Sequence, residues 1–289
     1  MKTAFNKICI YGVGLIGGSL ALAYKKVNPS VEIVGTGRNE NNLQQAKTLG
    51  VIDSFSMDLS EALKDVDLIV FAVPVGSMDA VFENVKSHLT ESMVLTDVGS
   101  TKGNVVASAN KILNGFSKNF VPGHPIAGIE KSGAESAFAE LFDQRRVILT
   151  PTKDTNSNAT KCITSLWQAC GAEVVEMSVE HHDEVLAATS HLPHMLAFSL
   201  VDTLSKMNDK QEIFKYAAGG FRDFTRIASS SPEMWQDICL ANSDALVAVI
   251  NEFQTDLSDL TKAIESGDKE TILKIFSGAK TARDQFCND

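Results

Sequence analysis

Two short segments of the sequence carry side chains that can move a proton. Residues 98–102 include Ser100, and His124 lies between a glycine and a proline in the segment 123–128. The ring of such a histidine can reach a ligand, and its pKa lies close to neutral pH, as a general base requires. A surface histidine without a role is the plainer interpretation. The glycine-rich turns and the nearby hydroxyl of Ser100 favour the catalytic one.

Further histidines gather in the second half of the chain. His191 and His194 stand three residues apart, so they share one face of a predicted helix. With His181 and His182 they raise the question of a zinc site, but no cysteine or carboxylate is spaced to complete a set of four ligands. The proline between His191 and His194 predicts a kink in the helix. We therefore expect no metal here, and direct contact of these histidines with an organic substrate.

Two arginines follow in the segment 219–226, which begins with Gly219. Arg222 and Arg226 lie four residues apart, and either guanidinium can grip a carboxylate with two parallel hydrogen bonds. Alternatively, each pairs with Asp223 or with another surface acid.

A glycine pattern near the start of the chain indicates a dinucleotide site. The pattern follows a predicted strand and begins a predicted helix; it consists of Gly12, Val13, Gly14, Leu15, Ile16 and Gly17. In this context the first glycine permits a tight turn, the second lets the backbone approach a pyrophosphate, and the third allows close packing of helix on strand. We predict a bound dinucleotide, although a module that binds a nucleotide only for regulation stays an alternative.

The end of the second predicted strand bears on the choice between NAD and NADP. An acidic residue there would bind the ribose of NAD, but the chain has Gly37, Arg38 and Asn39. Since an arginine can pair with a 2′-phosphate, NADP is favoured within NAD(P). The alternative is that Arg38 is a solvated loop charge and that Glu40 supplies the carboxylate. At the end of the third predicted strand, we expect Val73 and Pro74 to complete the cofactor site.

Short β-rich runs alternate with helical patterns up to about residue 178, and long helical patterns follow. The expected strands are 7–11, 31–36, 67–73, 93–97, 119–123, 146–150 and 172–177. The expected helical stretches of the second part are roughly 179–207, 210–229, 232–265 and 268–286. Alternation of this kind is typical of a mostly parallel sheet flanked by helices. We predict an α/β Rossmann domain over residues 1–178 and an all-α dimerisation domain over residues 179–289.

Composition limits the partners of the chain. Its 289 residues include 26 Lys and Arg against 36 Asp and Glu, a net charge of −10, so nucleic acid and anionic membranes are not expected partners. The apolar segment 8–24 is interrupted by four glycines, which argues against a signal peptide or a membrane helix. Five cysteines without a C-x-x-C pair predict reduced thiols and a cytoplasmic location.

Five motifs in order carry a family resemblance over nearly the whole chain. They are GVGLIGGSLA, DVGSTK, GHPIAGIEKSG, SHLPH and GGFRDFTRIA. Together they resemble prephenate and arogenate dehydrogenases of the TyrA family. The resemblance implies a Rossmann domain joined to a helical domain that forms a homodimer. It also implies NAD(P)-dependent oxidation of prephenate to 4-hydroxyphenylpyruvate, or of arogenate to tyrosine, with loss of CO₂.

Carried over position by position, the resemblance assigns roles to site residues. His124 resembles the catalytic histidine that accepts the proton of the ring hydroxyl, and Ser100 the serine that binds the same hydroxyl. His194 and Arg226 resemble substrate-binding residues, and Gly219 is expected to line the same pocket through its backbone. His191 and Arg222 are expected beside them. The acidic residue common in NAD-using members is absent at Gly37 and Arg38, which again favours NADP.

Because the chain is net acidic, attraction of a dianionic substrate must be local. We expect it from Arg226, with help from Arg222, Lys102 or Lys131. Two other functions stay open: a β-hydroxyacid dehydrogenase, and a non-catalytic sensor that binds a dinucleotide and signals through its helices. β-Hydroxyacid dehydrogenases rely on a catalytic lysine in the helical part, and no lysine after residue 178 stands in a convincing G-x-x-x-K setting. A sensor would need no base in the cleft.

Overall fold

The computed structural model describes residues 5–129, 131–208 and 210–286. Its large sheet has six strands in the order β3-β2-β1-β4-β5-β6, all paired in parallel. These strands are β1 (Lys7–Tyr11), β2 (Glu32–Thr36), β3 (Ser54–Phe55), β4 (Leu68–Phe71), β5 (Val94–Asp97) and β6 (Phe120–Val121). This is the strand order of a dinucleotide-binding Rossmann domain, so the predicted fold class is confirmed.

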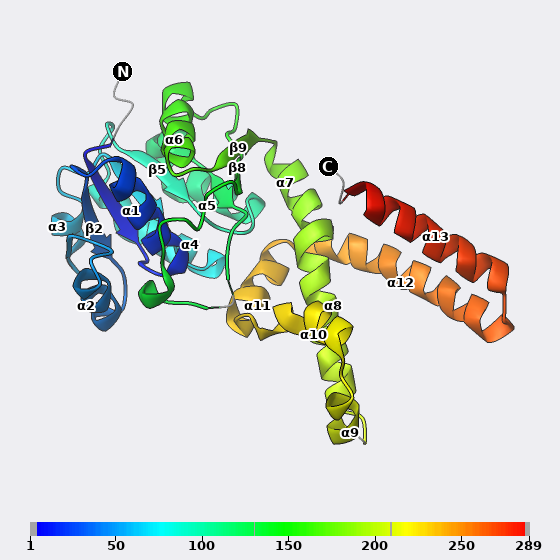
Figure 1. The fold of residues 1–289 in the computed structure, drawn as a ribbon. Coiled ribbons are helices and arrows are strands. Elements are labelled where there is room, and N and C mark those ends of the chain that lie inside the picture. The colour runs from blue at the N-terminus through cyan, green and yellow to red at the C-terminus, as the bar shows by residue number, and fades with distance from the viewer. Residues whose placement is uncertain (1–4, 130, 209, 287–289) are drawn as a thin grey trace. The chain divides into compact units, whose positions relative to one another are not determined.

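Both faces of the large sheet are buried, which explains why its strands read as continuous apolar runs. In β1, Ile8 and Ile10 pack into one core, whereas Cys9 and Tyr11 pack into the other. Helices before and after the strands cover these faces (Figure 1). They are α1 (Leu15–Val27), α2 (Glu40–Thr48), α3 (Leu59–Ala62), α4 (Met78–Val85), α5 (Gly103–Ile112) and α6 (Ser157–Ala169). Short 3-10 turns are η1 (Val75–Ser77), η2 (Lys86–His88), η3 (Asn114–Asn119) and η4 (Ala134–Ser136).

A second, three-stranded sheet follows the large one. It contains β7 (Gly123–Pro125), β8 (Arg146–Leu149) and β9 (Glu173–Glu176), with β7 antiparallel to β8 and β9 parallel to it. The strand expected at 119–123 is therefore two strands in two sheets, because the chain turns at Pro122, which cannot donate a ladder hydrogen bond. As a result His124 lies within a strand, opposite Ile148, and not on a loop.

The described elements after β9 are helical. They are α7 (Val179–Leu186), η5 (Ala187–His191), α8 (Leu192–Ser205), α9 (Lys210–Lys215), α10 (Gly219–Thr225), η6 (Arg226–Ser229), α11 (Pro232–Ala241), α12 (Ser243–Ser266) and α13 (Lys269–Phe286). The stretch expected at 179–207 is interrupted by η5, a π-helical turn that ends two residues before Pro193. A proline has no N–H for the preceding turn, and wider π turns often occur at such positions and at functional sites. The expected stretches 210–229 and 232–265 are likewise each broken in two, at residues 216–218 and at Asn242.

The chain divides into two compact units between Asn242 and Ser243. The first unit holds both sheets and α7 to α11. In the second, α12 packs against α13 after a turn at Gly267, whose φ of +66° suits a glycine. The domain boundary expected at residue 178 stays a prediction. None of the helices in the described part of the chain combines the length and the apolar character that a membrane span needs.

Candidate active site

The segments that were predicted to carry chemistry meet at one edge of the large sheet. The glycine turn follows β1, Val73 and Pro74 follow β4, and Ser100 follows β5. Since the strands are parallel, their carboxyl ends share this edge, where ligands bind in open α/β sheets. Val73 is half-buried against the second core, and Pro74 is exposed at the start of η1.

The three glycines of the turn have the three roles that a dinucleotide site needs. Gly12 has a φ of +96°, and a Cβ there would collide with the carbonyl of Ala72. At Gly17 a Cβ would lie 2.6 Å from the carbonyl oxygen of Gly12, so the helix packs closely on the strand. A Cβ at Gly14 would meet nothing within 4 Å, and no side chain caps α1 there. The turn and the helix N-terminus therefore fit a pyrophosphate.

The neighbouring segments shape the rim of this turn. Val13 is buried and its carbonyl accepts a hydrogen bond from the Asn42 side chain at 2.8 Å, which fixes the turn on α2. Leu15 is buried and Ile16 packs half-buried against the first core. Asn39 caps α2 by accepting from the Asn42 amide at 3.1 Å.

Two charged residues stand at this rim. Arg38 and Glu40 are both exposed. Gly37 lies beside the turn, where a Cβ would be 3.9 Å from the nitrogen of Gly12. There is therefore room both for Arg38 to bind the 2′-phosphate of NADP and for Glu40 to bind the ribose hydroxyl of NAD.

His124 begins a relay of three side chains. Its Nδ1 lies 2.9 Å from Nε2 of His182, and Nδ1 of His182 lies 2.7 Å from Oδ1 of Asp183. His182 is completely buried and His124 is 8% exposed. The relay joins β7 to α7, elements separated by more than 50 residues.

The relay fixes which nitrogen of His124 is free. Burial lowers the pKa of His124 well below its ordinary value, and the adjacent His182, Lys102 and His191 lower it further. Burial also lowers the pKa of His182, although its hydrogen bond to Asp183 acts the other way. With both rings neutral, His182 donates from Nδ1 to Asp183 and accepts at Nε2 from Nδ1–H of His124. Nε2 of His124 is then unprotonated and available as a base.

Asp183 is itself held in place by backbone amides. Its Oδ1 accepts from the N–H of Lys102 at 2.9 Å and its Oδ2 from the N–H of Gly103 at 2.7 Å. These bonds and the one from His182 lower the pKa of Asp183, although burial opposes them. A Cβ at Gly103 would lie 2.9 Å from Oδ2, so this approach requires glycine. Asp183 is therefore a carboxylate at neutral pH.

Sequence analysis missed the contacts that join His182 and Asp183 to His124. His182 was considered only as a metal ligand, and Asp183 was not considered. One signal was present: Ser178 caps α7, so His182 falls on the same inward face as Leu186. A polar residue at a buried helical position needs a partner, and that partner lies in β7.

Asn242 links His191 to this relay. Nδ2 of Asn242 donates to the Asp183 carbonyl at 2.8 Å and lies 3.2 Å from Nδ1 of His191. His191 is 1% exposed, and burial lowers its pKa to about 4. A hydrogen bond with the backbone of Ser100 acts in the opposite direction and raises the pKa of His191, so the half-buried Ser100 lies beside the His191 ring. The structure thus brings His124, Ser100 and His191 into one cluster.

His194 lies one helical turn after His191 and faces Trp235. The two rings stack with centroids 3.7 Å apart at an angle of 22°, and Nδ1 of His194 lies 2.9 Å from the Ser190 carbonyl. Because a carbonyl only accepts, His194 donates from Nδ1 and, when neutral, offers Nε2 as an acceptor. Burial lowers the pKa of His194, which favours this neutral form.

The remaining predicted substrate residues lie on α10 and η6, which pack against α8. Gly219 is the first residue of α10 and is exposed, and Arg222 is exposed in the same helix. Arg226 follows at the start of η6 and is also exposed. The packing brings these elements to the helix that carries His194.

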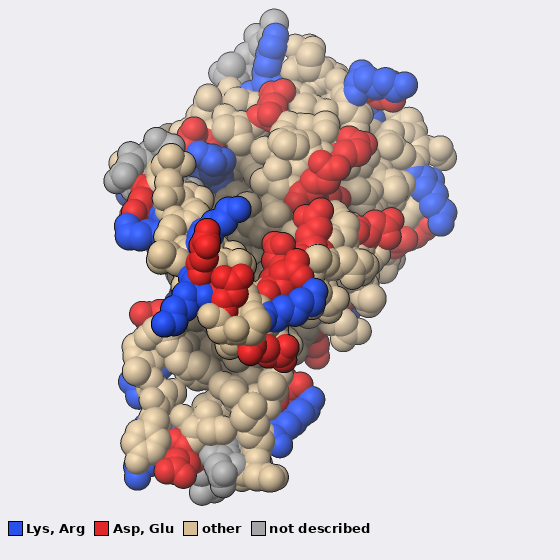
Figure 2. Space-filling view, turned by 90° about the vertical axis from the view of Figure 1, so that its right-hand side faces the viewer, with Lys and Arg blue, Asp and Glu red and all other residues tan. Residues whose placement is uncertain are grey.

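The face seen in Figure 2 is not a broad basic area. On the face seen in Figure 2, acidic and basic side chains are interspersed and red side chains form the longer runs. Of the lysines expected to attract a dianion, Lys131 is exposed, but Lys102 is completely buried. The expectation for Lys102 is therefore wrong, because its ammonium pairs with Asp97 inside the protein.

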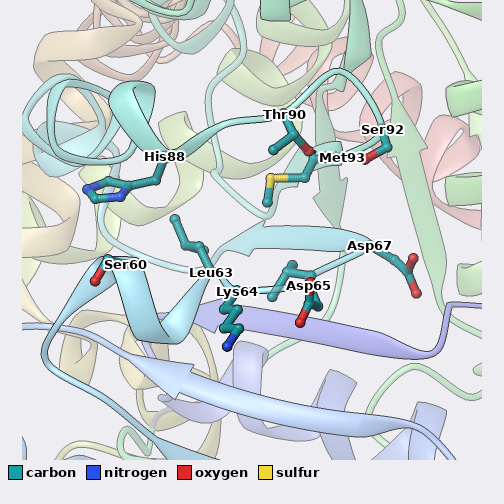
Figure 3. A pocket seen from close by; sticks show the side chains of 10 residues that line it. Ser60, Leu63, Lys64, Asp65, Asp67, His88, Thr90, Ser92 and Met93 are labelled. Atoms are coloured by element: carbon teal, nitrogen blue, oxygen red, sulfur yellow. Dashed lines mark hydrogen bonds between the residues drawn. The ribbon is translucent and has the colours of Figure 1, made fainter.

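A separate pocket lies at the opposite edge of the large sheet, before β4 and β5 (Figure 3). Its volume is about 530 Å³, and its lining includes Lys64, Asp65, His88 and Thr90. Lys64 and Asp65 precede β4, and Thr90 precedes β5, so this pocket is remote in the fold from His124. Within the described ranges, no group of three or more His, Cys, Asp or Glu residues is arranged to hold a metal ion. The absence of a metal stays a prediction.

Fold and site together define a dinucleotide-dependent oxidoreductase. A family model described as prephenate dehydrogenase, nucleotide-binding domain, matches residues 20–176, and one described as prephenate dehydrogenase, dimerization domain, matches residues 178–278. The chain therefore belongs to the prephenate dehydrogenase family.

Individual relatives agree with this assignment. The chain is 39% identical to the cyclohexadienyl dehydrogenase of Zymomonas mobilis, over 97% of this chain and 96% of that protein. It is also 39% identical to the prephenate dehydrogenase of Bacillus subtilis, over 98% of this chain and 77% of that protein. A crystal structure of the Aquifex aeolicus prephenate dehydrogenase with hydroxyphenyl propionate and NAD⁺ matches with a TM-score of 0.93 and 36% identity, covering 99% of this chain and 100% of that one.

Proposed function

We propose that the protein oxidises prephenate, arogenate or both, with loss of CO₂ and transfer of a hydride to a nicotinamide dinucleotide, as a step of tyrosine biosynthesis. The observation that carries the proposal is the relay of His124, His182 and Asp183 at the sheet edge that also presents the glycine turn. The names of the relatives support the same substrate class.

His124 acts as the general base in this proposal. Its free Nε2 takes the proton of the hydroxyl on C4 of the cyclohexadiene ring, while Nδ1–H keeps its bond to His182. A nicotinamide dinucleotide held at the glycine turn would supply the acceptor for the hydride that leaves C4 as this carbon becomes a carbonyl. The bond from C1 to its carboxylate then breaks, CO₂ leaves, and the electron pair makes the ring aromatic. The resulting phenolate takes the proton back from His124.

The relay keeps His124 ready for this step. Asp183 holds His182 in the tautomer that accepts from His124, so Nδ1 of His124 stays protonated and Nε2 stays free. After proton transfer the imidazolium of His124 faces the acceptor nitrogen of His182, which the carboxylate of Asp183 polarises. Ser100 is proposed to donate to the same ring hydroxyl.

The other residues position the substrate. We propose that Arg226 grips a substrate carboxylate, with Arg222 and Lys131 adding positive charge nearby. His194 is proposed to contact the side chain of the substrate, and Gly219 the same group through its backbone. His191, held by Asn242, would line the pocket between them. Holding a dianion in reach of His124 is a proximity effect that contributes roughly 10²-fold or more to the rate.

The preference for NADP over NAD is part of the proposal. Gly37, Arg38 and Asn39 place no carboxylate at the end of β2, and the exposed Arg38 can pair with a 2′-phosphate. Asn39 is engaged as the cap of α2, so Arg38 is the group left to bind the phosphate.

We further propose that the chain forms a homodimer through its helical part. The hairpin of α12 and α13 exposes large apolar side chains that water does not favour: Val247, Leu257, Ile264, Leu273, Ile275 and Phe276. A second copy of the same hairpin would bury them. The matched dimerization model, over 178–278, supports this proposal. A cytoplasmic location stays a prediction.

An assay of the purified protein with both substrates and both cofactors tests the proposal. We expect reduced cofactor to form with prephenate or arogenate in the presence of NAD or NADP. Turnover of a short 3-hydroxy acid without turnover of either cyclohexadiene would favour a β-hydroxyacid dehydrogenase. Cofactor binding without any turnover would favour a sensor.

A further inference from the structure

Lys102 is a completely buried lysine next to the histidine relay. Its Nζ donates to Oδ2 of Asp97 and, at 2.7 Å, to the carbonyl oxygen of Gly123. Lysine is almost never fully buried unless it is paired, and a buried ion pair gains little net stability over apolar residues of the same size. Stability alone therefore does not explain this pair.

The Asp97 carboxylate ties together the same segments as Lys102. Its Oδ2 accepts from the N–H of Gly99 at 2.8 Å and its Oδ1 from the N–H of Gly123 at 3.1 Å. Gly99 directly precedes Ser100, and Gly123 directly precedes His124. The pair consequently joins the Ser100 turn to the strand of the base through four hydrogen bonds, of which the one between Lys102 and Asp97 is also the ion pair.

The backbone of Lys102 reaches the other end of the relay. Its N–H donates to Oδ1 of Asp183, the oxygen that also accepts from His182. One residue thus touches the strand of the base through its side chain and the carboxylate of the relay through its amide. A shift of Lys102 would change the distance between His124 and His182.

We propose that Lys102 and Asp97 form a positioning pair, which holds His124 against His182 and the Ser100 turn, and that Lys102 does not bind the substrate. The inference rests on the proposed function, since it assigns a role in that reaction. The side chain of Lys102 is fully buried, so its ammonium presents no surface to a substrate carboxylate.

The positive charge of Lys102 also acts on the base. His182 on α7 and His191 on η5 both act on His124. Lys102, at the start of α5, also acts on it and is paired with Asp97. After burial and His182, Lys102 is the next cause that lowers the pKa of His124. Loss of its charge should raise that pKa, because the positive charge of Lys102 disfavours the imidazolium of His124.

Steady-state kinetics of Lys102→Met test the assignment, with Lys111→Met, an exposed lysine of α5, as the matched control. We expect kcat of Lys102→Met to fall about 10- to 100-fold, KM for the cyclohexadiene to stay within about threefold, and the acid limb of kcat/KM to move to higher pH. Lys111→Met should behave as wild type. A tenfold rise in KM with an unchanged kcat would mean that Lys102 binds substrate and would overturn the proposal. An unchanged kcat with an unmoved acid limb would also overturn it.

A second variant covers the case in which Lys102→Met does not fold. Asp97→Asn with Lys102→Met leaves no lone buried charge, so this double variant should fold, and its kcat should still fall about tenfold or more. Full wild-type kcat in the folded double variant would contradict the positioning role.

An NMR titration of His124 needs no turnover. A higher pKa of His124 in the double variant than in wild type supports the pair even if wild type oxidises neither substrate, a result that would count against the proposed function alone. An equal pKa contradicts the proposal.

Discussion

Nε2 of His182 lies 2.9 Å from Nδ1 of His124, and the two rings come from elements that are far apart in the sequence. In the proposed reaction, this contact decides which nitrogen of His124 acts as the base. It uses the nitrogen of His124 that faces the protein and leaves the other nitrogen for a substrate. A histidine with the opposite tautomer would present an N–H to the ring hydroxyl and could not remove its proton.

Replacing Asp183 by Asn should remove most of the activity while the fold is kept. The Asn amide can donate to Nδ1 of His182, which would then carry its proton on Nε2 and reverse the tautomer of His124. We expect kcat to fall by about 10²- to 10⁴-fold with a small change in KM. Glu184→Gln, the exposed neighbour on α7, is the control and should be unaffected. Near-normal kcat in Asp183→Asn would show that the relay does not set the tautomer.

Stability should decrease as the pH falls below about 6.5, because the buried histidines resist protonation. Burial lowers the pKa of His191 to about 4 in the folded chain, so at pH 5 the unfolded chain binds a proton there and the folded chain mostly does not. Stability from such a group is present above the unfolded pKa and is lost as pH falls toward the folded value. His191 alone should cost about 2 kcal/mol between pH 7 and pH 5.

Urea unfolding at pH 7 and pH 5 measures this effect. His191→Gln should show a smaller loss between the two pH values than wild type. His181→Gln is the control, since His181 is exposed. Equal pH dependence in His191→Gln and wild type would contradict the assigned burial effect.

Arg226→Ala should weaken substrate binding more than it slows the chemical step. A bidentate arginine that grips a carboxylate is worth roughly 1.5–3 kcal/mol, so KM should rise about 10- to 100-fold with a smaller fall in kcat. Lys215→Ala on the exposed surface of α9 provides the control for a lost positive charge. A fall in kcat with constant KM would remove Arg226 from substrate binding.

Arg38→Ala should change the cofactor preference. If Arg38 pairs with the 2′-phosphate, KM for NADP rises about tenfold or more while KM for NAD changes little. The comparison variant is Lys47→Ala, which removes an exposed charge in the last turn of α2. Equal effects of Arg38→Ala on both cofactors would favour the reading in which Arg38 is a solvated loop charge.

Local sequence signals predicted the parts of the site that are built from consecutive residues. The glycine turn is one example, because Gly12 and Gly17 are required by contacts within one strand, turn and helix unit. The large sheet is another, since its apolar strands are buried on both faces. His124 was found by its neighbours in the chain, although it lies in a strand of a second sheet.

Contacts between distant segments were not predictable in this way. Asp183 accepts hydrogen bonds from the backbone amides of Lys102 and Gly103, about 80 residues away in the chain. The residues around Asp183 in the sequence do not indicate these donors. The burial of Lys102 depends on Asp97 and on the carbonyl of Gly123, a partner that only the fold supplies. The π-helical turn before Pro193 was likewise not predicted, since the proline indicated only that the helix would be disturbed.

The most direct test of the central claim is the kcat of His124→Asn with prephenate or arogenate, whichever wild type oxidises, measured together with the Kd of the cofactor. The base role predicts a kcat lower by about 10²- to 10⁴-fold and an unchanged Kd, because Asn removes the proton acceptor and leaves the glycine turn intact. A kcat close to that of wild type would contradict the account.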